Sequence, residues 1–221
     1  MIEVRMSPGC GRRTGRMKSI DLFDLTRQAR YDALPLELVA RHEAGHAVMA
    51  HLHGGYIRRL VLGRARDGAP FARAFFVVHD EEAFVAVLSA GVLAMFLHER
   101  PRDLSFTAFQ RWLRTSDGEI QVLSAASDWM QILRRTGQPS GFGLDDFLER
   151  AVRPHFDQAI AKLAGSTDVI DRLTTLLHAS SSGIGRRAAR RFFAGKAPNS
   201  VATFLDRPSV LVSSFLERRA S

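Results

Sequence analysis

The stretch ARHEAGHAVMAHLHGG, at positions 40–55, constrains this chain more than any other. Its apolar residues predict a helix that begins in the turn of Pro35 and runs up to Gly54-Gly55. His42 and His46 are four residues apart, so they project from one face of that helix, a turn apart. A helix of this kind can present two imidazoles to one metal ion.

Glu43 and Gly45 complete the pattern. In an H-E-x-x-H helix, two neutral imidazoles bind Zn²⁺ and the glutamate takes a proton from the water on the metal. A glycine in a helix interior costs about 1 kcal/mol relative to alanine, so we expect another segment to pass close to the helix at Gly45. The alternative is a histidine-rich helix without a metal, whose histidines lie on the surface or are satisfied in the core.

The wider string LVARHEAGHAVMAHL resembles the peptidase domain of the FtsH family of ATP-dependent membrane zinc metalloproteases. In layout the resemblance extends over about residues 35–180, through a β segment, an apolar helix with an A-G pair (LSAGVLAMF) and an S-D dipeptide. It implies a compact, largely helical zinc-peptidase domain. It also implies that His42 and His46 bind zinc and that Glu43 is the general base.

The resemblance further implies a third zinc ligand, an aspartate far downstream. Two S-D dipeptides make Asp128 and Asp117 the candidates, and Glu119 lies in the same segment. We favour Asp128 because a bulky apolar residue, Trp129, follows it directly. Asp117 fits better the start of a long helix. Without a metal, Asp117 would be a helix N-cap and Asp128 a solvated charge on a helix surface.

The remaining pattern predicts an α+β fold that is mainly α, with a small β-hairpin or sheet. The segments YIRRLVLG and FARAFFVV, at 56–63 and 71–78, alternate as strands do. The apolar stretch 83–97 falls short of the roughly 18 to 20 residues that span a bilayer, which favours a buried core helix. Helices are predicted at about 21–30, 35–53, 83–97, 106–113, 118–135, 144–163 and 168–178.

The 221 residues fit one domain with tails. We expect a flexible basic N-terminal arm at 1–19, a metallopeptidase-like domain at 20–180 and a basic, partly helical C-terminal tail at 181–221. Cys10 is the single cysteine, so a metal must be held by histidines and carboxylates rather than by a cysteine-rich module. The N-terminus lacks the apolar core of a signal peptide, which favours a soluble, cytoplasmic protein.

The expected activity is hydrolysis of peptide bonds in a peptide or an unfolded protein. The strand 71–78 is a candidate for edge pairing with substrate, and the alternative is a core strand. FtsH proteins join their peptidase domain to an ATPase, but GIGRRAARRFFAGKA lacks the phosphate-loop spacing. An ATPase would therefore be a separate partner. Around Met95 the chain is apolar where the family has an acidic residue. This loss favours the rival interpretation, a catalytically inactive scaffold or protein-interaction domain.

The net charge of +8 and the pI near 10.8 suggest a second rival. Four arginines of the C-terminal segment recur along one helix face, next to two phenylalanines: Arg186, Arg187, Arg190 and Arg191. Such a face can contact the phosphates of a nucleic acid or an anionic membrane surface. The ordinary alternative is a solvated basic face.

Overall fold

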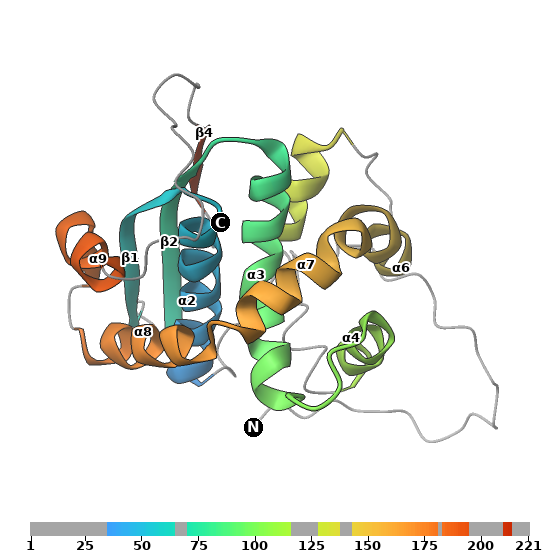
Figure 1. Ribbon diagram of the computed structural model, residues 1–221, viewed down its shortest axis with the longest axis horizontal. Helices are drawn as coiled ribbons and strands as arrows, with labels where there is room; N and C mark the ends of the chain where they lie inside the picture. The colour runs from blue at the N-terminus through green and yellow to red at the C-terminus, as the bar shows by residue number, and fades with distance from the viewer. Residues whose placement is uncertain are drawn as a thin grey trace, which may run out of the picture.

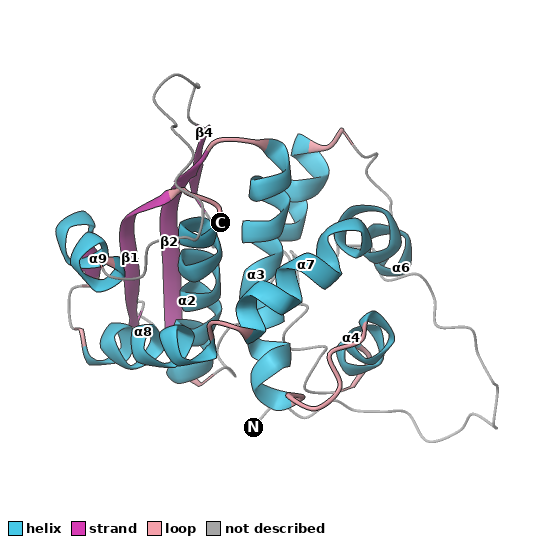
Figure 2. Cartoon of the chain, in the orientation of Figure 1, coloured by secondary structure: helices cyan, strands magenta, loops and turns pink. Residues whose placement is uncertain are grey.

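The protein is α+β and mainly helical, as expected (Figures 1 and 2). The computed structural model describes residues 35–64, 70–115, 128–137, 143–180, 183–194 and 210–213. Its elements are α2 (Leu36–Leu52), β1 (Tyr56–Arg64), β2 (Pro70–Val78), α3 (Glu81–Glu99), α4 (Phe106–Leu113), α6 (Leu144–Phe147), the π-helical turn η2 (Leu148–Val152), α7 (Arg153–Ala164), α8 (Thr167–Ala179), β3 (Ile184–Gly185), α9 (Arg186–Phe193) and β4 (Val210–Ser213). Residues 128–135 are also helical.

The helix α2 is the centre of the fold. Figure 1 shows it between the sheet and α3, and it also contacts α7 and α8. Every residue from 39 to 50 is buried. Because α2 is covered on all sides, its polar residues lie in the core and need partners there.

The sheet has the order β3-β1-β2-β4, and each neighbouring pair is antiparallel. The predicted hairpin is confirmed as β1 and β2. Its register shifts by one residue between Ile57 and Arg59, as in a β-bulge. The bulge interrupts the alternation of buried and exposed residues in β1. Ile57, Leu60 and Leu62 are buried, whereas the two consecutive residues Arg58 and Arg59 are both exposed.

The second edge of β2 is partly occupied. Residues 75–78 pair with β4 on the side opposite β1. Among the described residues, no strand lies on that side of residues 70–74. The hypothesis of edge pairing with substrate thus concerns the first half of β2.

The helix α3 is the apolar helix expected at 83–97, extended at both ends. It begins after Asp80, whose carboxylate accepts a hydrogen bond of 2.6 Å from the backbone N–H of Ala83. By length and composition α3 could cross a membrane, but 83% of its apolar window is buried inside the protein. This burial is that of a core helix.

The two helices α2 and α3 pack closely at Gly45. A Cβ at this position would lie 2.5 Å from the carbonyl oxygen of Ala90 and 2.7 Å from the Cβ of Ala94. The expectation that a segment passes close to Gly45 is therefore confirmed. His42 lies opposite Gly91 and His46 opposite Val87, so the helices run antiparallel here.

The segment after residue 180 packs onto the same sheet where it is described. β3 pairs with β1, and α9 contacts β1. The predicted division into an arm, a domain and a tail stays a prediction. The arm, the helix expected at 21–30 and the first part of the helix expected at 118–135 lie outside the described residues.

Gly45→Ala should test the close contact of α2 with α3. Helix propensity alone would stabilise the variant by about 1 kcal/mol, but the added methyl meets backbone and a short side chain that cannot turn away. We expect net destabilisation of roughly 1–3 kcal/mol in urea unfolding. Gly185→Ala is the control, because its Cβ meets nothing within 4 Å. A variant more stable than wild type would contradict the close contact.

Candidate metal centre

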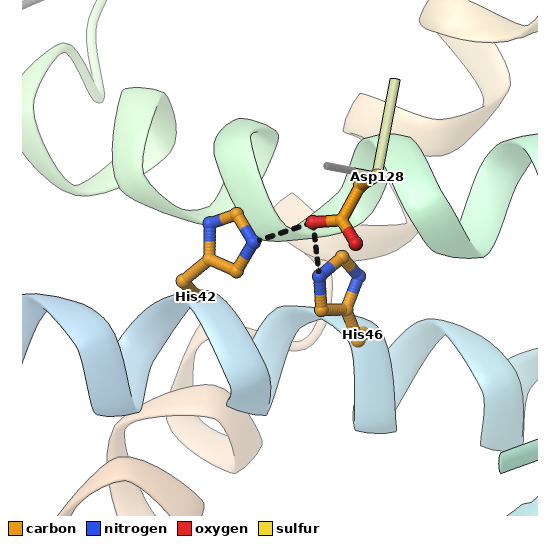
Figure 3. A group of neighbouring side chains, drawn as sticks. All are labelled: His42, His46 and Asp128. Atoms are coloured by element: carbon orange, nitrogen blue, oxygen red, sulfur yellow. Dashed lines mark hydrogen bonds and ion pairs between the residues drawn. The ribbon is translucent and has the colours of Figure 1, made fainter. Parts of the chain in front are cut away.

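His42, His46 and Asp128 meet in the core (Figure 3). The Nε2 atoms of His42 and His46 lie 3.0 Å and 3.2 Å from the same oxygen, Oδ2 of Asp128. The three residues are 6%, 0% and 2% exposed. One ligand atom from each lies within 4.8 Å of the others. The structure thus brings the two motif histidines together with the favoured aspartate, in a group that could hold a metal ion.

Asp128 comes from a different segment than the histidines. It opens the described part of the helix at 128–135, and Figure 3 shows its carboxylate turned toward both imidazoles of α2. Trp129, the next residue, is fully buried and packs against the ring of Phe147 at 5.4 Å between centroids. The burial of this large side chain fixes the start of the segment, and with it the position of Asp128.

The backbone of α3 fixes the orientation of His46. Its Nδ1–H donates a hydrogen bond of 2.6 Å to the carbonyl oxygen of Val87. In a neutral ring Nε2 then carries a lone pair, and it faces Oδ2 of Asp128. Two acceptors at this distance repel each other unless a proton or a metal cation lies between them. A carbonyl that orients the second ring nitrogen is typical of a metal-binding histidine.

Gly91 makes room for His42. A Cβ at Gly91 would lie 2.5 Å from Nε2 of His42 and 2.6 Å from its Cε1. The His42 ring stands almost perpendicular to that of His46, at 82°, with 4.6 Å between centroids. The absent side chain at Gly91 therefore allows the His42 ring to reach Asp128.

The electrostatics of the group are strongly coupled. Burial lowers the pKa of His46, but the charge of Asp128 and its hydrogen bond outweigh burial and raise that pKa to about 9. Burial raises the pKa of Asp128, but the charge of His46 and the hydrogen bonds from both imidazoles lower it to about 2. Burial also lowers the pKa of His42, by more than the hydrogen bond to Asp128 raises it. Without a metal, the group holds one proton between His46 and Asp128.

The donor set fits a small divalent metal such as zinc. Two imidazole nitrogens and one carboxylate are ligands that Zn²⁺ accepts, and catalytic zinc sites have three protein ligands and one open position. Ligand atoms on a tetrahedral zinc are about 3.4 Å apart, close to the 3.0 Å and 3.2 Å separations found here. Within the described residues, the second oxygen of Asp128 is buried without a hydrogen-bond partner. That oxygen is free to take part in coordination.

The other predicted site residues differ in their placement. Glu43 is buried, and its charge helps to raise the pKa of His46, so its carboxylate lies near that ring. It is not one of the three grouped residues. Asp117 and Glu119 lie outside the described residues, so Asp117 stays a prediction as the alternative third ligand.

Sequence reasoning missed two contributions from α3, the Val87 carbonyl and the space at Gly91. The A-G pair of α3 signalled Gly91, but only as part of a resemblance and without a role. Sequence reasoning also missed an ion pair of 2.7 Å between Arg41 and Asp171 of α8. Arg41 is buried and directly precedes His42. This pair ties the start of the histidine helix to α8, and no sequence spacing announces it.

No protein-family model matches the chain, and neither a curated protein nor a solved structure shows significant similarity to it. The likeness to FtsH-type peptidases rests on the HEAGH string and the layout around it.

Gly91→Ala should disrupt metal binding without removing a ligand. The new Cβ would meet three ring atoms of His42, and the buried ring has to move away from Asp128. We expect the affinity for zinc to fall by roughly tenfold or more, measured by competition with a chelator. Gly185→Ala, where a Cβ meets open space, should bind zinc like wild type. Unchanged affinity in Gly91→Ala would mean that His42 is not a ligand.

Zinc affinity should rise with pH. Below a pH of about 9, zinc has to displace the proton on His46, whereas Asp128 stays ionised down to a pH of about 2. Between about pH 6 and pH 9 we therefore expect up to a tenfold gain in affinity per pH unit. The gain should level off above the pKa of His46. Calorimetry in buffers of different ionisation enthalpy should show about one proton released per zinc near neutral pH, and binding without proton release would contradict this protonation state.

Proposed function

We propose that this protein is a zinc-dependent metallopeptidase. Its zinc ion would be held by His42, His46 and Asp128, and it would hydrolyse peptide bonds. The observation that carries the proposal is the meeting of the two HEAGH histidines with a buried aspartate 82 and 86 positions downstream. The resemblance of LVARHEAGHAVMAHL to FtsH-type peptidases supports the same chemistry.

Each part of the chain has a role in such a reaction. When bound, zinc would supply a water of lowered pKa and positive charge for the developing oxyanion. Glu43 accepts the proton of the attacking water and passes it to the nitrogen of the leaving amine. The Val87 carbonyl holds His46 in the tautomer that leaves Nε2 free to bind metal. Asp128 balances part of the metal charge.

The proposed substrate is a peptide or an unfolded protein in extended form. β2 runs past the candidate site, because the ring of Phe76 stacks with that of His46 at 6.3 Å. A substrate strand would add to residues 70–74 of this strand and gain backbone hydrogen bonds there. An ATPase that unfolds substrates would be a separate chain.

A second candidate function is a metal-stabilised scaffold without catalysis. Two observations favour it: the proposed ligands are all buried, and Met95 of α3 is fully buried where the resembled family has an acidic residue. Structural zinc sites are closed to solvent, whereas catalytic sites keep a position for water. Both candidate functions include the bound metal, but only the peptidase would hydrolyse peptide bonds.

Metal content tests the premise of both functions. Wild type should carry about one zinc per chain, and Asp128→Ala should lose it, measured by elemental analysis of purified protein. Asp117→Ala should retain the zinc. Loss in Asp117→Ala alone would assign the third ligand to Asp117, and no zinc in wild type after incubation with the metal would contradict the site.

Glu43→Gln separates peptidase from scaffold. The amide cannot accept the proton of the attacking water, so cleavage of a quenched peptide library should fall by about 10²- to 10⁴-fold, while the zinc content stays at the wild-type level. Glu37→Gln is the matched control, because it makes the same change at an exposed position of α2. If both variants and wild type bind zinc but none cleaves peptides, the scaffold function is the better description.

A further inference from the structure

A second site lies away from the metal group, at the C-terminal end of α2. A half-open cavity of about 410 Å³ is lined by this end of α2, the start of β1 and the helix α9. None of His42, His46 and Asp128 lines it. The volume is in the range of small-molecule sites, which are mostly apolar with a few polar groups.

Two arginines line the cavity, Arg186 and Arg190. They are four residues apart, so they project from the same face of α9. The guanidinium of Arg186 lies 4.9 Å over the ring of Tyr56, which also lines the cavity, and this contact restrains the arginine there. Neither α9 nor β1 contains an acidic residue. Among the described residues, no carboxylate pairs with either arginine.

The wall of the cavity is aromatic and apolar. Phe193 is buried and stacks on the imidazole of His51, with 4.4 Å between centroids and 24° between ring planes. Ile57 and Ala189, both buried, extend this wall. A bare inorganic anion would satisfy the arginines but leave the apolar wall without a partner.

We propose that this cavity binds a small organic anion, with its carboxylate or phosphate on Arg186 and Arg190 and a flat apolar body against Phe193. Guanidinium groups suit both anions, because each can accept paired hydrogen bonds from the planar fork. The same cavity is lined by two guanidinium groups and by an aromatic and apolar wall, which is the combination that a ligand with one charged end requires.

The geometry separates this site from a general basic surface. Arg187 and Arg191 lie on the same helix and are exposed, but they do not line the cavity. A nucleic acid held by its phosphates would use all four arginines and would be strongly salt-dependent. A small anion in the cavity should use Arg186 and Arg190 only.

Calorimetric titration of the full chain with phenyl phosphate, 3-phenylpropionate, inorganic phosphate and the neutral 3-phenylpropanol tests the proposal. At least one of the two aromatic anions should bind saturably with one site per chain, and more tightly than phosphate or the alcohol. Arg186→Ala and Arg190→Ala should each weaken binding about tenfold or more. The matched controls Arg187→Ala and Arg191→Ala should stay within about twofold of wild type. Thermal unfolding of each variant verifies that it is folded.

The outcomes are distinct. Preference for phenyl phosphate identifies a phosphorylated ligand, and preference for 3-phenylpropionate identifies a carboxylic acid; both support the site. Absence of saturable binding by either anion in wild type overturns it. Equal weakening in all four arginine variants, with displacement by a short single-stranded oligonucleotide, also overturns it and assigns α9 to nucleic acid.

Discussion

The close antiparallel packing of α2 on α3 positions every residue of the candidate metal centre that comes from these two helices. At Gly45 the backbone of α3 comes so near that no side chain fits between the helices. This distance allows the Val87 carbonyl to reach the ring of His46 and brings Gly91 against His42. Wider spacing would leave two imidazoles buried without fixed orientation, at a considerable desolvation cost.

Because the site is buried, each of its polar and charged groups needs a partner inside the core. Two histidines, one aspartate and Glu43 share a core that has few other polar groups, and Asp128 compensates both imidazoles at once. A proton satisfies this arrangement at neutral pH, and a divalent metal held by the two imidazoles and Asp128 would supply more positive charge to the same groups. A buried group with pKa values shifted in this way is a candidate for a functional site.

The structure divides the four arginines of α9 into two pairs. On α9, four arginines are equivalent in the sequence, but two of them line a cavity with an aromatic wall and the other two do not. The bulge in β1 adds two exposed arginines, Arg58 and Arg59, on the strand that α9 covers. Both elements carry positive charge and no carboxylate, which suits an anion in the cavity.

Most of the helices and strands, and the two histidines of the site, could be predicted from the amino-acid sequence. Periodicity, the glycines at 54 and 55 and the strand alternation suffice for α2, the hairpin and α3, because these signals are local. The spacing of His42 and His46 fixes their common face for the same reason. Local signals favoured Asp128 over Asp117 only through the resemblance and the neighbouring Trp129, since both aspartates follow a serine, and no local signal could place either one beside that face. Only the tertiary structure placed Asp128 beside the imidazoles, through the burial of Trp129 and the close contact of α2 with α3.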